Sequence, residues 1–386
     1  MSVIEAAAEP VPSIAGAIAA PALPPATERG PFGWARKRLF GSWLSTAVTL
    51  ALGYLVLRLA WGFFAWGVLH AIWSVPYSAG GVADASVCRQ ALGVGACWAV
   101  IGDKYRFILF GPYPYTEQWR PLICIGLFVA LYIISAMRRF WRRALAAVWV
   151  VILAAIFTLM WGGVFGMPFV ATDQWGGLPL TLLLATFGIA AAFPLAVLVA
   201  LGRRARDLPL VRWLCVIYVE LIRGVPLITV LFMASVLFPL FMPEGIDPNK
   251  LLRAQVAIIL FAAAYLAEVV RGGLQALPRG QFEAADALGL SYWYKMAFVA
   301  LPQALRLVIP PLVNTFIGLF KDTSLVLIIG IYDLLTAGKT AIADPNWSPF
   351  ANEVYLFVGA IYFVFCYAMS RYSRGLETSF SASRRR

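Results

Sequence analysis

The chain has 386 residues, of which 61% are apolar and 13% are charged, and its mean hydropathy is +0.80. A soluble domain has about 25% charged residues, and its interior is too small to hide this much apolar side chain. These figures exclude a soluble fold, a disordered chain and a disulfide-rich scaffold, and they predict an all-α integral membrane protein in a lipid bilayer. The net charge of +12 does not point to a nucleic acid, because cytoplasmic loops of membrane proteins carry excess Lys and Arg.

The first part of the chain is rich in Ala and Pro and contains no long apolar run. Residues 1–42 are therefore expected to form a cytoplasmic, disordered tail. The single histidine, His70, and the scattered cysteines lack the spacing of zinc ligands, so no metal site is expected.

Apolar runs long enough to cross a bilayer predict about eight transmembrane helices. The first three form an N-terminal extension over 43–166, which includes a mixed outer segment at 73–120 with Cys88 and Cys97. The last five form a core over 167–375, and a basic cytoplasmic tail follows at 376–386. The eight runs lie at about 43–72, 121–137, 144–166, 178–201, 213–242, 251–272, 303–331 and 353–371.

The distribution of positive charge predicts the orientation of these helices. If the N-terminus lies inside, most Lys and Arg residues fall on the cytoplasmic side, including the basic knot at 138–143. Both chain ends are then inside, and Cys88 and Cys97 lie outside, where thiols oxidise. A disulfide between them would close a short loop, and two free thiols are the alternative.

A short helix is predicted in the longest non-apolar stretch between the last five runs, at about 273–300. Good helix formers extend from Gln281 to Leu288, with Pro278 and Gly280 before them and Gly289 after them. This helix is expected outside the bilayer, on the cytoplasmic side. Its apolar face, with Phe282, Ala285 and Leu288, requires a contact, either with another protein or with the chain's own helices.

Several motifs resemble those of one transporter family. The stretch 280–289, followed by Leu301 and Pro302, resembles the EAA loop of binding-protein-dependent ABC importer permeases. The region from about 178 to 371 resembles the polar amino-acid uptake family, most clearly at 218–227, 264–272, 310–314 and 319–325. The three added spans and the outer Cys88 and Cys97 segment are similar to the M-type permease subunit of general L-amino-acid transport systems.

The resemblance implies a non-catalytic, multi-pass permease subunit of an ATP-driven amino-acid importer in the bacterial inner membrane. It also implies three partners: a companion permease in a heterodimer, a cytoplasmic ABC ATPase dimer and a periplasmic amino-acid-binding protein. ATP and Mg would be bound by the ATPase, so no cofactor is expected in this chain. An ion-coupled secondary transporter is the alternative, although the halves show no convincing inverted repeat.

The resemblance also implies how the ATPase would be contacted. The residues of this coupling region are Gly280, Glu283, Ala284, Ala285 and Gly289. Glu283 is assigned to polar contacts with the ATPase. Gly289 is expected to allow a sharp turn where a side chain would clash. Leu301 and Pro302 are expected to begin the next span, since proline is tolerated in a first helical turn.

Two Glu-x-x-Arg-Gly units contain Glu220 with Arg223 and Glu268 with Arg271. A spacing of three puts each pair on one helix face, at the cytoplasmic end of a span. Ion pairs that steady the helix ends are one interpretation, and a gate is the other.

Four consecutive polar residues, from Lys321 through Asp322 and Thr323 to Ser324, fall within the run at 303–331. Charges inside a span are costly and face a cavity or a partner. An amino-acid substrate carries a carboxylate and an ammonium group, so these four residues, with Asn314 on the face of Lys321, are candidates for the substrate path. A Lys–Asp pair that seals a helix interface is the alternative.

Overall fold

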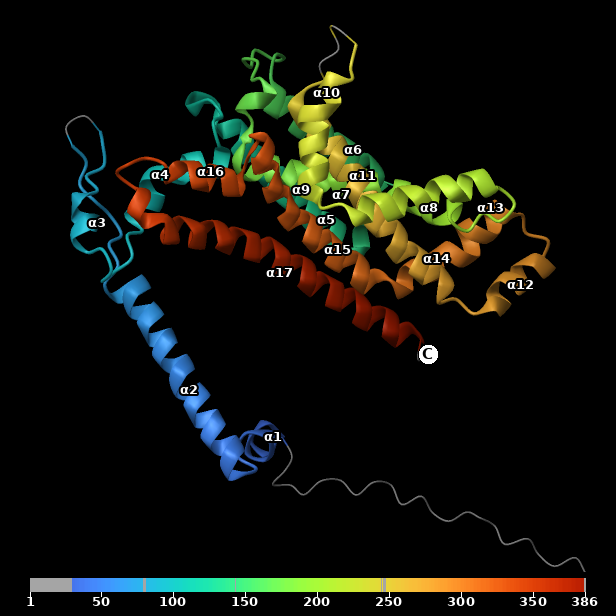
Figure 1. The fold of residues 1–386 in the computed structure, drawn as a ribbon, viewed down its shortest axis with the longest axis horizontal. Coiled ribbons are helices and arrows are strands. Elements are labelled where there is room, and N and C mark those ends of the chain that lie inside the picture. Colours follow the sequence, from blue (N-terminus) through green and yellow to red (C-terminus); the bar gives the residue numbers. More distant parts are fainter. Residues whose placement is uncertain (1–29, 79–80, 143, 244, 246–247, 385–386) are drawn as a thin grey trace, which may run out of the picture. The chain divides into compact units, whose positions relative to one another are not determined.

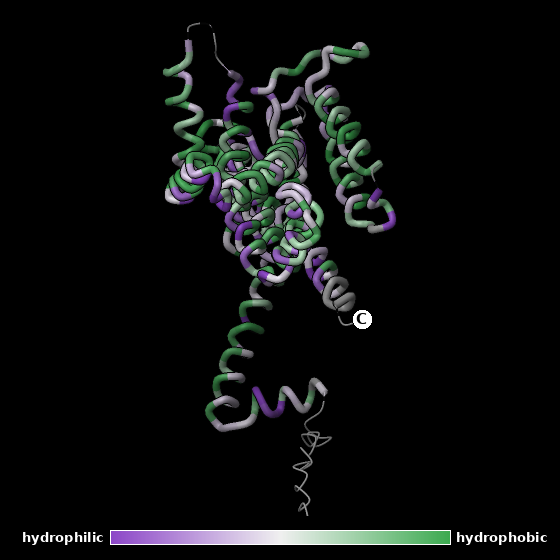
Figure 2. The backbone as a smooth tube through the Cα atoms, turned by 90° about the vertical axis from the view of Figure 1, so that its right-hand side faces the viewer, coloured by the Kyte–Doolittle hydropathy of each residue, from purple (hydrophilic) through white to green (hydrophobic). Residues whose placement is uncertain are grey.

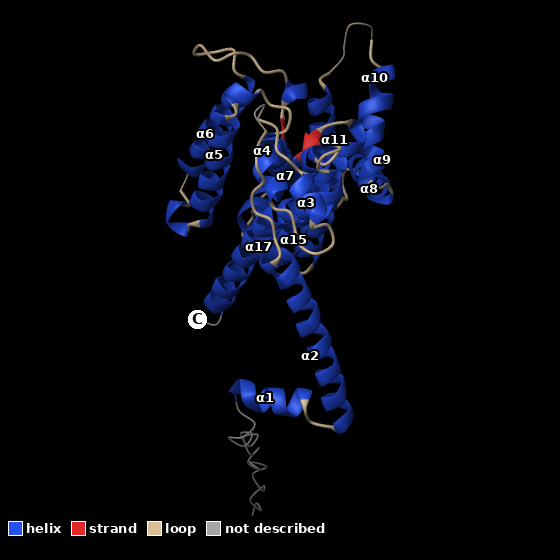
Figure 3. Ribbon diagram, turned by 90° about the vertical axis from the view of Figure 1, so that its left-hand side faces the viewer, coloured by secondary structure: helices blue, strands red, loops and turns tan. Residues whose placement is uncertain are grey.

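The computed structural model describes residues 30–78, 81–142, 144–243, 245 and 248–384, which are mostly helical (Figures 1 and 3). The chain divides into two compact units, Met1–His70 and Ala71–Arg386, and each is described by itself. This division differs from the predicted boundary at residue 166, because the outer segment and the second and third spans have contacts with the core.

Unit 1 contains a short helix, α1 (Gly30–Leu39), and a long one, α2 (Trp43–Phe64), which a π-helical segment extends over Ala65–Leu69. Ser42 caps α2, since its side chain accepts a hydrogen bond from the backbone N–H of Ser45. Helix α1 corrects part of the predicted disordered tail, whose residues 1–29 lie outside the described part of the chain.

Unit 2 contains the remaining helices and a two-residue strand. In chain order they are α3 (Ser86–Gln90), α4 (Ala99–Phe110), α5 (Trp119–Ala136), α6 (Ala144–Trp161), α7 (Gly177–Gly202), α8 (Pro209–Gly224), α9 (Leu227–Phe232), α10 (Phe238–Leu240), α11 (Lys250–Gln275), α12 (Arg279–Ala287), α13 (Tyr292–Tyr294), α14 (Leu301–Leu307), α15 (Ile309–Asp322), β1 (Tyr332–Asp333), α16 (Leu334–Ala341) and α17 (Ala351–Arg384). Short 3₁₀ segments lie at Tyr115–Glu117, Arg138–Phe140, Thr172–Gln174, Thr323–Ile329 and Ser348–Phe350, and π-helical ones at Met233–Leu237 and Lys295–Ala300.

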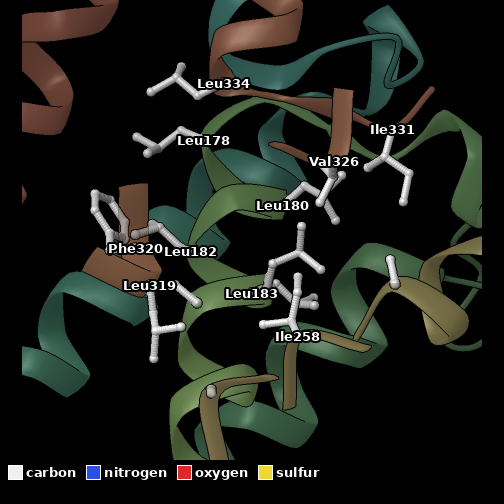
Figure 4. Packing of buried hydrophobic residues seen from close by; sticks show 14 of the residues in the cluster. Leu178, Leu180, Leu182, Leu183, Ile258, Leu319, Phe320, Val326, Ile331 and Leu334 are labelled. Atoms are coloured by element: carbon white, nitrogen blue, oxygen red, sulfur yellow. The ribbon is translucent and has the colours of Figure 1, made fainter. Parts of the chain in front are cut away.

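The centre of unit 2 is the pairing of α7 with α11. Helix α7 buries leucines on several sides, and they contact Ile258 of α11, Leu319 and Phe320 of α15, and residues near β1 (Figure 4). A helix that is apolar all round is suited to a buried position. Helix α17 packs along α15, and α5 pairs with α6.

Within the described residues, seven helices are long and apolar enough to cross a membrane, in agreement with seven of the eight predicted runs (Figure 2). The predicted run at 213–242 is instead broken, because the chain turns by 104° between Pro209–Gly224 and Leu227–Leu240. Val225 is extended, with φ −114° and ψ 135°. A residue before a proline avoids the helical region, so Pro226 accounts for the break.

The C-terminal part also differs from the expectation in two places. Helix α17 continues to Arg384, so the predicted tail at 376–386 is largely helical. Helical structure before the seventh span begins at Tyr292 rather than at Leu301, and it passes through the π-helical segment Lys295–Ala300 before Pro302. π-Helical segments are rare and occur mostly as single turns inside α-helices.

Unit 2 contains two regions in which segments far apart in sequence meet. At the first, called the α12 end, the C-terminal ends of α7 and α11 meet α12. At the second, called the disulfide end, the structure joins Cys88 and Cys97 by a disulfide beside the loop 342–350 that precedes α17.

Candidate functional site

The predicted short helix is present as α12, Arg279–Ala287, which begins two residues earlier than expected. Pro278 precedes it with φ −57° and ψ 138°, and the chain leaves it at Gly289, whose φ is +70°. The expected side-chain clash at Gly289 is wrong, because an added Cβ would meet nothing within 4 Å. Glycine is favoured there by the positive φ alone.

The faces of α12 divide differently from the prediction. Ala285 is only 2% exposed and Phe282 is partly buried against the core, whereas Leu288 is 79% exposed. Glu283 and Ala284 are also exposed. The expected apolar face of three residues is therefore a two-residue contact with the chain's own helices, and Leu288 belongs to the side that remains open.

Contacts from three segments hold α12 in place. The guanidinium carbon of Arg204 lies 5.1 Å from the ring centre of Phe282. Asp286 forms an ion pair with Lys295, and the side-chain amide of Gln303 donates a hydrogen bond of 2.9 Å to Gln281. Helix α12 is thus fixed through its packed side, while its Glu283 side is free of these contacts.

An arginine and glutamate cluster lies beside α12. Arg271 pairs with Glu268, as the sequence predicts. The predicted pairing of Glu220 with Arg223 is wrong, because Glu220 lies 2.8 Å from Arg203, and Arg223 lies 3.9 Å from Glu268.

The residue that the sequence analysis missed in this cluster is Arg203. Its guanidinium donates to Glu220 on α8 and, at 2.7 Å, to Glu268 on α11. In the sequence, Arg203 stands out only as a charged residue directly after an apolar run. That position does not identify its partners Glu220 and Glu268, which lie 17 and 65 positions away.

The candidate path residues fall where α15 changes into a 3₁₀ segment. Lys321 and Asn314 are exposed, seven residues apart, as expected for one helix face. Asp322 is partly buried, and among the described ion pairs none joins it to Lys321, so the alternative of a sealing Lys–Asp pair has no ion pair to support it.

The two hydroxyl residues of this group have local roles. Thr323 is 1% exposed, and its hydroxyl donates a hydrogen bond of 2.8 Å to the Phe320 carbonyl. The Ser324 hydroxyl donates to the Lys321 carbonyl at the same distance. Thr323 therefore points into the protein, away from the exposed Lys321.

A buried carboxylate that the sequence did not reveal lies at the start of α16. Asp333 is fully buried and accepts hydrogen bonds from the backbone N–H groups of Leu335 and Thr336 and from the Tyr362 hydroxyl. Burial raises the pKa of Asp333 above its ordinary value, although these hydrogen bonds act in the opposite direction. Asp333 caps α16 and ties it to α17.

The N-terminal extension contacts the core through polar groups at the disulfide end. Lys104 of α4 lies 2.9 Å from Asp344, and Trp347 donates to Asp103 at 2.9 Å. Arg89, next to Cys88 in α3, donates to Asn346, and the backbone N–H of Cys97 donates to the buried Glu353 of α17. These residues are named the outer clamp: Arg89, Asp103, Lys104, Asp344, Asn346, Trp347 and Glu353.

Comparison with known proteins identifies the family of this chain. Residues 192–381 match the binding-protein-dependent transport system inner membrane component. The inner membrane amino-acid ABC transporter permease protein YhdY of Escherichia coli K12 is 48% identical over 357 residues, which are 91% of this chain and 93% of that protein. The chain belongs to this permease family.

One further permease matches over a similar extent, and a solved transporter structure matches about half of the chain. The glutamate/glutamine/aspartate/asparagine transport system permease protein BztC of Rhodobacter capsulatus is 36% identical over 433 residues, covering 93% of this chain and 95% of that protein. A crystal structure of an amino acid ABC transporter with histidines covers 53% of this chain and 92% of its own, with 29% identity and a TM-score of 0.47. Since YhdY and BztC match nearly end to end, they share the N-terminal extension.

Membership assigns the chain to the inner membrane as a multi-pass transport subunit. The relatives are permease subunits, so the chain's part in the importer is transport across the membrane.

Proposed function

We propose that this permease, together with a companion permease in a heterodimer, lines the path by which an ATP-driven importer moves amino acids into the cell. The names of YhdY and BztC, which specify amino-acid transport, support this substrate class. The other partners are a cytoplasmic ATPase dimer, which binds ATP and Mg, and a periplasmic amino-acid-binding protein. An ion-coupled secondary transporter, the alternative, has no support among the relatives.

The observation that carries the proposal is the two-sided character of α12. Ala285 and Phe282 pack on the protein's own helices, while Glu283, Ala284 and Leu288 remain exposed. A helix fixed on one side and open on the other is suited to receive a separate subunit as a rigid body. The exposed side is therefore the docking surface of the ATPase.

Reversal of one charge tests this docking surface. Glu283→Lys should leave the permease in the membrane but reduce co-purification of the ATPase and substrate-stimulated ATP hydrolysis. Asp207→Lys is the matched control, because Asp207 is also exposed, in the turn between α7 and α8. Equal ATPase association in wild type and Glu283→Lys would contradict the assignment of α12.

We also propose that Lys321 and Asp322 line the substrate path, near Asn314. A charge that faces lipid is costly, so the exposed Lys321 on an otherwise apolar span is expected to face the companion permease or the path between the two subunits. Ser324 flanks this group, and the inward-pointing Thr323 supports the turn from α15 into the 3₁₀ segment.

The paired variant Lys321→Met with Asp322→Asn tests the path, since it removes both charges at similar size and leaves neither charge alone. It should assemble normally and lose uptake. Thr315→Val is the control, because the Thr315 hydroxyl bonds only to the Pro311 carbonyl among the described contacts. Normal uptake of every amino acid by the assembled paired variant would remove these residues from the path.

A further inference from the structure

Two consecutive arginines at the end of α7 hold different parts of the α12 end. Arg203 is 11% exposed and bridges α8 and α11 through Glu220 and Glu268. Arg204 contacts Phe282 of α12 and the last turn of α11. A single peptide unit therefore separates a contact with the membrane helices from a contact with the docking helix.

The guanidinium group of Arg204 makes two contacts, a hydrogen bond and a stacking contact with an aromatic ring. One amino group donates a hydrogen bond of 3.0 Å to the carbonyl of Leu274, in the last turn of α11, where helix carbonyls lack partners within the helix. The same guanidinium lies over the ring of Phe282 on α12, at 5.1 Å. Arginine is suited to this double contact, because its group is planar, stacks on aromatic rings and has a rigid set of donors.

The other polar contacts of α12 do not reach α7. Asp286 contacts Lys295, and Gln281 contacts Gln303; these partners lie after α12 in the chain, in the π-helical segment Lys295–Ala300 and in α14. Among the described hydrogen bonds, ion pairs and cation–π contacts, the one between Arg204 and Phe282 joins α12 to α7. Phe282 also packs on the buried core cluster, so this ring is the anchor of α12.

We propose that Arg204 is a positioning residue that couples movement of α12 to the membrane helices, and that Arg203 passes this movement on to α8 and α11. The proposal rests on the proposed function, in which the ATPase docks on α12. A displacement of Phe282 changes the position of Arg204, and through the adjacent peptide unit it changes the position of Arg203. Arg203 then pulls on Glu220 and Glu268 together, so α8 and α11 move as one group.

The test uses the whole importer, with ATPase, companion permease and binding protein, reconstituted in liposomes. Arg204→Gln should keep ATPase association and basal ATP hydrolysis, while the amount of amino acid transported per ATP falls about tenfold, the scale expected for one cation–π contact with one hydrogen bond. Arg204→Lys should not restore the ratio. Arg206→Gln is the control, because Arg206 is exposed two residues further along the chain.

A second variant shows whether Arg204 acts through Phe282. Phe282→Leu should lower the transport per ATP to a similar degree, Phe282→Tyr should preserve it, and the double variant with Arg204→Gln should be no worse than either single change, since residues that act as one unit are not additive. Multiplied losses in the double variant would overturn the proposal. So would a normal transport ratio in Arg204→Gln, or failure of that variant to assemble, which would make Arg204 purely structural.

Failure of the proposed function gives a different result. If Glu283→Lys associates normally with the ATPase, then α12 is not the docking helix, whatever Arg204→Gln does. If Glu283→Lys loses the ATPase while Arg204→Gln retains both the ATPase and the normal ratio, docking on α12 stands and the coupling role of Arg204 is wrong.

Discussion

Gly289 and Gly280 provide a direct test of why the coupling region contains glycines at both ends. At either position an added Cβ would meet nothing within 4 Å, so the available space is the same. The two differ in backbone conformation, because Gly289 has a φ of +70° and Gly280 lies within α12. Substitution by alanine therefore compares a left-handed residue with a helical one.

The left-handed conformation costs an L-residue about 1–2 kcal/mol. Gly289→Ala should therefore reduce the population of the native turn after α12, and weaken ATPase binding by roughly five- to thirtyfold. Gly280→Ala should be neutral or stabilise α12 by a few tenths to about 1 kcal/mol, because alanine favours the helix. Gly289→Asn should fall between wild type and Gly289→Ala, since asparagine visits this conformation more readily.

The assay is the dissociation constant between the purified permease pair and its ATPase, with thermal unfolding of the permease as a check on folding. Equal losses for Gly280→Ala and Gly289→Ala would show that both glycines serve close contact with the ATPase. ATPase binding as weak in Gly289→Asn as in Gly289→Ala would likewise refute the backbone argument.

Three further outcomes follow from named contacts. Gly273→Ala should lower the free energy of unfolding by about 1–3 kcal/mol, because its Cβ would lie 2.8 Å from the Ala304 carbonyl oxygen. Gly272→Ala is the control, because a Cβ at Gly272 would meet nothing within 4 Å, and thermal unfolding compares the two variants. Replacing Cys88 and Cys97 by serine should lower the melting temperature, since a bond across nine positions stabilises by about 2.6 kcal/mol, and reduction of the wild type should reproduce the shift. The Lys104–Asp344 pair should contribute equally throughout the neutral range. The hydrogen bond that Asp344 accepts from Lys104 lowers the pKa of Asp344. The stability that this carboxylate contributes is therefore lost as the pH falls below the ordinary value of 3.8. Burial lowers the pKa of Lys104, but the carboxylates of Asp344 and Asp103 outweigh burial and raise it. The stability that Lys104 contributes is therefore lost as the pH rises above 10.5. The free energy of unfolding of wild type and Lys104→Met, measured against pH, checks both limits.

The sequence predicted those features that depend on neighbours along the chain. Apolar runs of sufficient length located seven of the long helices, and Pro278 with Gly289 located α12. The contacts that hold these helices together depend on residues far apart in sequence. Arg203 meets Glu268 across 65 positions, and Arg89 meets Asn346 across 257. One sequence without alignment gives no pairing for such charges, so both the cluster and the outer clamp emerged only from the structure.

The side of α12 that meets other residues was harder to predict for a different reason. Phe282, Ala285 and Leu288 have the spacing of one helix face, but α12 ends at Ala287 and the chain then turns at Gly289. Leu288 therefore leaves the helical register and becomes exposed. A periodicity argument holds only within a helix, and an error of one residue in the helix end moves a side chain from the packed side to the open side.

Arg223 shows how a misplaced charge can mark a break in an apolar run. A single span over 213–242 is expected to keep this arginine at its cytoplasmic end, ten residues after the run begins, because a charge deeper in the bilayer is costly. The structure removes the cost, because the chain turns by 104° just after Arg223 and leaves it at the α12 end, 3.9 Å from Glu268 and over the ring of Tyr265. Arg223, Gly224 and Pro226 together favour two helices over one. A cation inside an apolar run and followed by glycine and proline is therefore better interpreted as a helix end than as a buried charge.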